Sequence, residues 1–376
     1  ARPRSWTNPD TTPGRASRWT FSAQKHRRQR HDGDSQLAAI ASAVAFGPRR
    51  WHWRCRAGRP SEAFDFGSIL TLLVRMPRLK FIKQMIFDGR GAPLEPSSRP
   101  QPLEWKDNEV TGSVLGHSTV FLNFFGVKMI TDPVFSKRVG PGIPPFILGP
   151  KRYFSPALSP KELPPPDVIV LSHAHFDHFD VWSLRKFNRW TPVVTARATG
   201  DLLRCHGFRN VHELDWGQSK VVATKNGDVR FTALEVAHWG ARMLRDDHRG
   251  YNAYLMERNG HALCFAGDTA YTTAFGKLRD HDQTIDLMLM PIGAYDPWIK
   301  AHCSPEQAVE MSRQAGALAF VPIHHETFKL SSEAMSEPAK RLRAALAGAP
   351  PRLLTTSIGE TFRVPVRKSV AMSVGG

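Results

Sequence analysis

The sequence lacks the features that mark several common classes of protein. No apolar run approaches the ~20 residues that a membrane-spanning helix needs, so we expect no transmembrane segment. Only four cysteines occur, Cys55, Cys205, Cys264 and Cys303, and they stand far apart without paired spacing. We therefore expect no disulfide framework, and a reducing compartment, the cytoplasm, suits the chain better.

Acidic residues are scarce in the first 60 positions, which hold 13 lysines and arginines against three aspartates. This segment alone supplies ten of the 17 net positive charges, so the remaining 316 residues carry only a small excess. A basic tail says little about the rest of the chain, and we expect no nucleic-acid partner.

The beginning of the chain also lacks hydrophobic periodicity, as well as the apolar core and cleavage site of a targeting signal. We interpret residues 1–75 as a basic extension that is disordered or not native, and residues 76–104 as a lead-in segment. Residues 105–376 are the expected catalytic domain. Residues 68–87 mix apolar and cationic side chains, which suits either peripheral contact with an anionic membrane or simple packing.

The stretch LSHAHFDHFD places four metal-ligand side chains directly after the apolar run DVIVL. In an extended segment residues two apart project to the same side, so His173 and His175 can converge on one ion. Asp177 and His178 lie further along the turn and can address a second ion. Asp180 is the expected N-cap of a helix over VWSLRKFNRW, which would hold the loop in place.

Further ligand types stand at the ends of three other predicted strands. VRFTALEVAHWG leads to His238, HALCFAGDT to Asp268, and ALAFVPIHHETF to the pair His324 and His325. Side chains from one sheet edge gather in open α/β architectures. Each residue alone could be an ordinary buried polar group, but together they complete two coordination shells. By contrast, the proline-dense residues 141–167 predict a long irregular loop.

At this point the chain resembles the metallo-β-lactamase fold superfamily. The motifs that carry the likeness span roughly residues 105–365 and are GHSTV, TDPVFSKR, LGPKRYFSP, LSHAHFDH, ELDWG, FAGDTAY, PIGAYDP and PIHHETF. They are similar to the branch that contains the N-acyl-phosphatidylethanolamine-hydrolysing phospholipase D and, more distantly, the ascorbate-6-phosphate lactonases. The resemblance implies an α/β fold, an αββα four-layer sandwich with the site at one edge of its two sheets.

The resemblance also implies two zinc ions and assigns their ligands. One ion would be held by His173, His175 and His238, the second by Asp177, His178 and His324, with Asp268 bridging them. Asp132 is expected to orient ligands from outside the coordination shell, and His117 either does likewise or is a plain strand residue. His325 falls where the phospholipase has tryptophan and receives no ligand role. Manganese or iron would suit the same ligands.

The implied reaction is attack by a metal-bridging hydroxide on a phosphorus or carbonyl centre, with Asp177 or Asp268 accepting a proton. No serine or cysteine nucleophile is needed, and Ser172 is expected to be a packing residue. The predicted substrate contacts are Trp239, Tyr295, Trp298, His302, Lys151 and Arg152. Val181 departs from the tyrosine of the phospholipase, which leaves lipid recognition open.

Three functions are compatible with these residues. The first is a zinc phosphodiesterase of the phospholipase D type that acts on N-acyl-phosphatidylethanolamine-like lipids. The second is a lactonase or another carbonyl hydrolase. The third is a metal-bearing or nucleic-acid-binding scaffold without turnover, supported only by the basic tail. The oligomeric state stays open.

Overall fold

A computed structural model describes residues 91–243, 246–280 and 284–365, all within one compact unit. The predictions for residues 1–75 and for the membrane-surface segment 68–87 lie outside these described residues. In the part of the chain that is described, no helix has the length and apolar character needed to cross a membrane.

The first sheet has seven strands in the order β16-β1-β2-β3-β6-β7-β8. They are β1 (Val110–Gly116), β2 (Thr119–Phe124), β3 (Val127–Thr131), β6 (Val168–Leu171), β7 (Val193–Ala196), β8 (Val211–Leu214) and β16 (Thr361–Val364). The strands from β16 to β3 pair antiparallel, and those from β3 to β8 pair parallel.

The second sheet repeats this plan, in the order β15-β14-β13-β12-β11-β10-β9. Its strands are β9 (Ser219–Val222), β10 (Val229–Leu234), β11 (Ala253–Arg258), β12 (His261–Phe265), β13 (Ile285–Pro291), β14 (Ala319–Ile323) and β15 (Arg352–Leu353). The strands from β12 to β15 are parallel, and those from β9 to β12 are antiparallel.

Both faces of these sheets are covered, which explains why the central strands are apolar at nearly every position. On β2, Leu122 and Phe124 point toward the second sheet, where they share one core with Phe231 and Tyr254. The preceding residue, Phe121, points the other way, into a core beneath the helices. Because side chains alternate across a strand, a strand buried on both faces reads as one apolar run.

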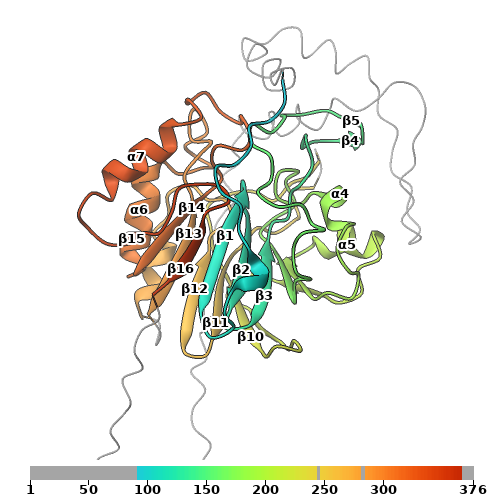
Figure 1. Ribbon diagram of the computed structural model, residues 1–376, viewed down its shortest axis with the longest axis horizontal. Coiled ribbons are helices and arrows are strands. Elements are labelled where there is room, and N and C mark those ends of the chain that lie inside the picture. Colours follow the sequence, from blue (N-terminus) through green and yellow to red (C-terminus); the bar gives the residue numbers. More distant parts are fainter. Residues whose placement is uncertain (1–90, 244–245, 281–283, 366–376) are drawn as a thin grey trace, which may run out of the picture. The chain divides into compact units, whose positions relative to one another are not determined.

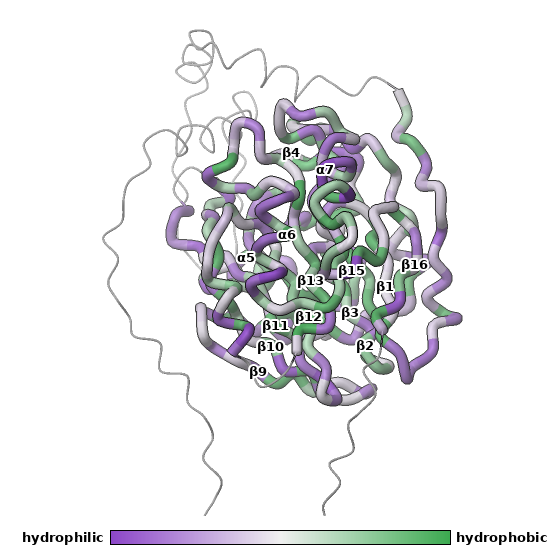
Figure 2. The backbone as a smooth tube through the Cα atoms, turned by 90° about the vertical axis from the view of Figure 1, so that its left-hand side faces the viewer, coloured by the Kyte–Doolittle hydropathy of each residue, from purple (hydrophilic) through white to green (hydrophobic). Residues whose placement is uncertain are grey.

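Helices form the outer layers (Figure 1). α6 (Pro305–Gln314) and α7 (Glu337–Ala345) pack on the second sheet together with the 3-10 helix η2 (Ala274–Asp280). α4 (Val181–Leu184) and α5 (Gly200–Cys205) lie on the outer side of the first sheet. Figure 2 shows hydrophobic residues concentrated in the strands and polar ones along the helices. The predicted αββα sandwich is confirmed.

Two local predictions need correction. Asp180 does cap a helix, since its carboxylate accepts a hydrogen bond from the Trp182 amide at 3.1 Å, but α4 has four residues rather than ten. Arg189 ends it by donating to the carbonyls of Leu184 and Phe187. The predicted irregular loop contains a small hairpin, β4 (Gly142–Ile143) paired with β5 (Phe146–Ile147).

Candidate metal centre

The predicted ligands and the supporting residue Asp132 come together at one edge of both sheets. Asp132 follows β3 and His173 lies two residues beyond β6, both in the first sheet, while Asp268 follows β12 and His324 follows β14 in the second. All four strands belong to the parallel halves of their sheets, whose carboxyl ends meet at the same edge. His238 arrives differently, because β10 ends at Leu234 and a short loop brings the histidine to the cluster.

The first group of ligands consists of His173, His175 and His238. The His173 Nε2 and His175 Nδ1 atoms lie 2.8 Å apart, and His238 Nε2 lies 3.3 Å from the same His175 atom. His238 is oriented through its other nitrogen, Nδ1, which is 2.9 Å from the carbonyl oxygen of Ala301. Three imidazole nitrogens that point at a common centre match one half of the predicted ligand set.

The second group contains Asp177, His178 and His324. The Asp177 Oδ2 atom lies 3.7 Å from His178 Nε2 and 3.6 Å from His324 Nε2. His117 joins this group, with its Nε2 atom 3.1 Å from the same carboxylate oxygen. That contact places His117 against Asp177, where it can orient this ligand.

Asp268 connects the two groups. Its Oδ2 atom is 3.1 Å from both His178 Nε2 and His324 Nε2, and 3.7 Å from His238 Nε2. His302 Nδ1 lies 3.8 Å from the same oxygen. One carboxylate therefore faces the nitrogen atoms of both ligand groups, as a bridging ligand requires.

The atoms at the centre of this cluster are ones that a metal would satisfy. Among the described residues, His178 Nε2, both ring nitrogens of His324, His302 Nδ1 and Asp268 Oδ1 are buried without a hydrogen-bond partner. Burying polar groups without partners is costly, and imidazole with carboxylate is a donor set suited to zinc, manganese or iron. His175 and Asp177 are only half-buried, which leaves the site a side open to solvent.

The three histidines of the first group are held neutral. Burial, together with repulsion from His238, lowers the pKa of His175 to about 3. Burial lowers the pKa of His238 to about 4 despite attraction from Asp268, and the pKa of His173 also falls well below its ordinary value. A neutral imidazole is the form that binds a metal, so this group is ready at neutral pH.

The second group behaves in the opposite way. Burial opposes charge on His178 and His324, but Asp268 and Asp177 outweigh it and raise the pKa of His178 well above its usual value and that of His324 to about 9. Burial likewise opposes ionisation of the two aspartates, yet attraction to His178 keeps both pKa values well below the usual range. Without a metal, two imidazolium cations thus neutralise the two carboxylates, and bound metal cations would take over that role.

A second layer of hydrogen bonds fixes the ligands. The Asp132 Oδ2 atom lies 2.7 Å from His178 Nδ1 and accepts from the Ser172 hydroxyl at 2.6 Å, while Oδ1 accepts from the Ser172 amide at 2.8 Å. The Ser172 hydroxyl also lies 2.9 Å from His173 Nδ1. The interpretation of Ser172 as a packing residue therefore needs correction, because it links Asp132 to ligands of both groups.

Three residues of the cluster have a strained backbone. Asp132, His117 and His324 all have positive φ values, of 31°, 55° and 59°. Residues other than glycine seldom adopt this region, and it persists where the surroundings hold it in place. Here the His324 amide donates to the His117 carbonyl at 3.1 Å, and the His117 amide donates to the Thr327 hydroxyl at 2.6 Å.

Arg242 braces the loop that carries the ligands. Its Nη1 atom donates to the carbonyls of Ala174, at 2.9 Å, and Phe179, at 2.7 Å, which lie at the two ends of the loop. Its guanidinium stacks 3.9 Å from the ring centre of Phe176 between them. Burial lowers the pKa of Arg242 to about 10, so the group stays charged at neutral pH. No sequence motif pointed to this residue.

We expect Arg242→Ala to weaken metal binding by about tenfold, because ligand loops lose affinity when their outer contacts are removed. Arg242→Lys should also weaken binding, since an ammonium cannot both stack and reach two carbonyls in the planar geometry of a guanidinium. Metal affinity measured by chelator competition tests this, with Arg197→Ala, an exposed arginine paired to Asp215, as the matched control. Unchanged affinity in Arg242→Ala would show that the loop holds its shape unaided.

The structure brings two of the six predicted substrate contacts into the cluster. Trp239 lies with its ring centre 4.7 Å from that of His175, and its buried Nε1 atom has no partner among the described residues. His302 lies 5.1 Å from His238, ring centre to ring centre. Both therefore remain candidates for contact with substrate.

The other four predicted contacts lie outside the cluster, and three of them are engaged elsewhere. The Tyr295 hydroxyl donates to Glu337 on α7 at 2.8 Å, and Trp298 Nε1 donates to the Leu330 carbonyl at 3.2 Å. Lys151 donates to the Gly91 carbonyl. Arg152 is buried with its guanidinium 5.3 Å from the ring centre of Phe328, which in turn contacts His117, and its Nε and Nη1 atoms have no hydrogen-bond partner among the described residues. Their roles toward substrate stay predictions.

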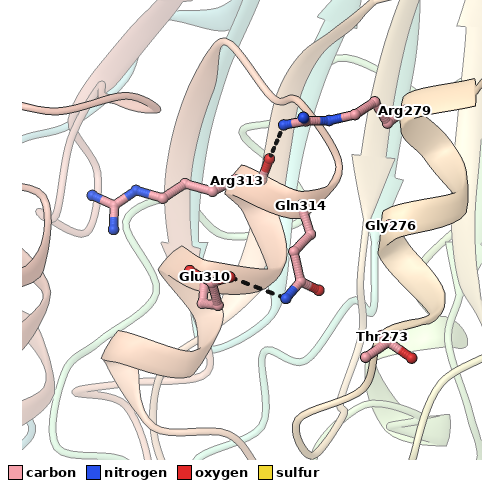
Figure 3. A pocket seen from close by; sticks show the side chains of 6 residues that line it. All are labelled: Thr273, Gly276, Arg279, Glu310, Arg313 and Gln314. Carbon is pink, nitrogen blue, oxygen red and sulfur yellow. Dashed lines mark hydrogen bonds between the residues drawn. The ribbon is translucent and has the colours of Figure 1, made fainter.

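A separate hollow lies between η2 and α6 (Figure 3). It is lined by Thr273, Gly276, Arg279, Glu310, Arg313 and Gln314. Arg279 donates to the Arg313 carbonyl at 2.9 Å, and Gln314 to Glu310 at 3.0 Å, so the polar groups largely satisfy one another. The metal-ligand groups described above share no residue with this lining.

Two sheets face to face between helices, with a paired histidine and aspartate cluster at one edge, define a metal-dependent hydrolase of the αββα class. The family model of the beta-lactamase superfamily domain matches residues 128–325, which is more than half of the chain. The chain therefore belongs to the metallo-β-lactamase superfamily, and the family resemblance seen in its motifs is confirmed.

Curated relatives support the branch as well. An uncharacterized protein of Mycobacterium tuberculosis is 32% identical over 277 residues, which cover 71% of each chain. The N-acyl-phosphatidylethanolamine-hydrolyzing phospholipase D 1 of Caenorhabditis elegans is 31% identical over 61% of this chain and 67% of its own. The mitochondrial enzyme of that name from Saccharomyces cerevisiae is 29% identical over 69% of this chain and 58% of its own length.

Solved structures agree on the fold. An isothiocyanate hydrolase from Delia radicum gut bacteria superposes with a TM-score of 0.54 at 17% identity, covering 67% of this chain and 98% of that one. A possible metal-dependent hydrolase from Veillonella parvula gives 0.53 at 16% identity, covering 68% of this chain and all of the other.

Proposed function

We propose that the protein is a dinuclear zinc phosphodiesterase of the phospholipase D type, acting on N-acyl-phosphatidylethanolamine-like lipids. The single observation that carries the dinuclear part is the position of Asp268, whose one oxygen faces histidines of both ligand groups. The lipid part rests on relatives that bear that activity in their names and are 29% and 31% identical.

Two ions held by these groups would supply an activated water near neutral pH and a positive charge for the phosphoryl oxygens. Around them the chain's own residues do the rest. Asp177 is half-buried at the open side, where its carboxylate can accept a proton from the attacking water. The Trp239 indole can donate a hydrogen bond to a substrate oxygen, and its ring offers an apolar surface beside His175.

Hydrolysis by the metal-loaded protein tests the proposal, run in parallel on N-acyl-phosphatidylethanolamine and on a panel of acyl lactones. We expect release of phosphatidic acid that disappears when a chelator removes the metal and returns when zinc is restored. Zinc, manganese and iron should be restored separately, with metal content measured in each sample.

Turnover of lactones alone would move the protein to the carbonyl hydrolases. Two bound metals without turnover of either substrate would leave the metal centre intact and contradict both substrate assignments. A preparation that binds no metal would contradict the proposal as a whole.

A further inference from the structure

The β4–β5 hairpin leaves four consecutive apolar residues exposed. Ile143, Pro144, Pro145 and Phe146 form its turn, and the Phe146 side chain is 69% accessible. Prolines are ordinary in an exposed turn, but Ile143 and Phe146 expose two large hydrophobic side chains on either side of them. Figure 1 shows this hairpin standing apart from the two large sheets.

The hairpin is shaped by glycine. Gly140, Gly142 and Gly149 have φ values of 146°, 133° and 149°, and a Cβ atom on any of them would collide with a carbonyl oxygen of the chain segment that faces it. Only glycine accepts both the backbone angle and the close approach. The exposed turn is therefore held in a defined position at the end of a narrow ribbon.

This ribbon, residues 139–150, has its base near the candidate metal centre. At its base Val139 packs in one cluster with Phe328, whose ring centre lies 5.1 Å from that of His117. His117 in turn contacts Asp177. The base of the ribbon thus lies one layer of side chains away from the second ligand group.

Cations flank the foot of the ribbon. Residues 139–150 carry no charge, but Lys137 and Arg138 precede them and Lys151 follows. Lys137 is exposed, and it precedes Arg138 at the foot of the ribbon. At ~3.3 Å per residue these cations lie roughly 15 to 20 Å behind the turn. If the turn enters a bilayer by about 5–10 Å, these cations lie roughly 5 to 15 Å from the bilayer surface. The nearer part of this range is within the Debye length of about 8 Å, so an anionic surface can attract them.

We propose that the β4–β5 hairpin docks the protein on an anionic lipid bilayer, with Ile143 and Phe146 entering the boundary between headgroups and acyl chains. A second copy of the chain fits less well, because a stable protein interface needs about 800 Å² from each partner and the turn offers four residues. The proposal is independent of which bond the metal centre hydrolyses.

Co-sedimentation of the full chain with vesicles tests the proposal, using phosphatidylcholine alone and phosphatidylcholine mixed with phosphatidylglycerol. We expect binding to the mixed vesicles that weakens about tenfold or more in Ile143→Ser/Phe146→Ser, because two apolar side chains no longer enter the bilayer. Lys137→Gln should weaken binding about fivefold on the anionic vesicles only. Leu103→Ser is the matched control, since Leu103 is 83% exposed in the 3-10 helix η1 (Pro102–Glu104).

Equal binding by the wild-type protein and the double variant would overturn the proposal, and would assign any membrane affinity to another segment such as residues 68–87. No binding by the wild-type protein would overturn it too. So would a dimer of the wild-type protein that the double variant fails to form.

If the double variant does not fold, Phe146→Trp provides the test. Brominated lipid should quench the fluorescence of the tryptophan at position 146 but not that of Leu103→Trp. Hydrolysis of detergent-dispersed substrate separates docking from catalysis, since the double variant should retain it.

Discussion

Asp268→Ala should lower kcat/KM by about 10²- to 10³-fold and should weaken metal binding at both sites, because the loss of one preorganised electrostatic group typically costs this much. The reason is geometric. One Asp268 oxygen lies within 3.7 Å of nitrogens from His178, His238 and His324, so both ligand groups lose a partner at once. Metal content by atomic emission and steady-state hydrolysis measure the two effects.

Asp177→Ala is the matched comparison for Asp268→Ala. Asp177 lies against His178, His324 and His117, and it belongs to the second ligand group but not to the first. We therefore expect it to lose one metal while the site of His173, His175 and His238 keeps its own. An Asp268→Ala protein that still bound two metals and turned over normally would refute the bridging role.

The sequence was sufficient to predict which side chains gather into one cluster, because each candidate ligand stands close to the end of a strand with a clear apolar pattern. β6 and β14 were recognisable as short buried runs, and His173 and His324 follow them within two residues. The bridging role of Asp268 stays a prediction that rests on family resemblance, since no local pattern distinguishes a bridging aspartate from one in a turn.

The supporting residues were harder to predict, because their partners are distant in sequence. Arg242 donates hydrogen bonds to carbonyls 63 and 68 positions away in the sequence. Ser172 donates to Asp132, which is 40 positions away. Contacts of this kind leave no periodicity and no motif. The length of α4 was overestimated for a related reason, because hydrophobic spacing in VWSLRKFNRW continued beyond the point where Arg189 closes the helix.

The same supporting layer yields the second large effect. Asp132→Asn should reduce metal affinity by 10- to 100-fold, the range found when the outer partner of a ligating histidine is changed. The Asp132 carboxylate lies 2.7 Å from His178 Nδ1 and accepts two hydrogen bonds from Ser172. An amide that turns its nitrogen toward any of these donors loses that bond, and it cannot attract the imidazole ring as an anion does.

Asp132→Ala should add a loss of stability, because it leaves three buried donors without an acceptor at about 1–3 kcal/mol each. Asp167→Asn is the matched control for both variants. Asp167 is also a buried carboxylate that accepts from a backbone amide, that of Lys128 at 2.8 Å, but it precedes β6 and lies at the opposite end of that strand from the ligands. It should lower the melting temperature and leave zinc affinity unchanged. If Asp132→Asn matched Asp167→Asn in zinc affinity, Asp132 would be only a structural carboxylate, and orientation of His178 would have to come from the metal itself.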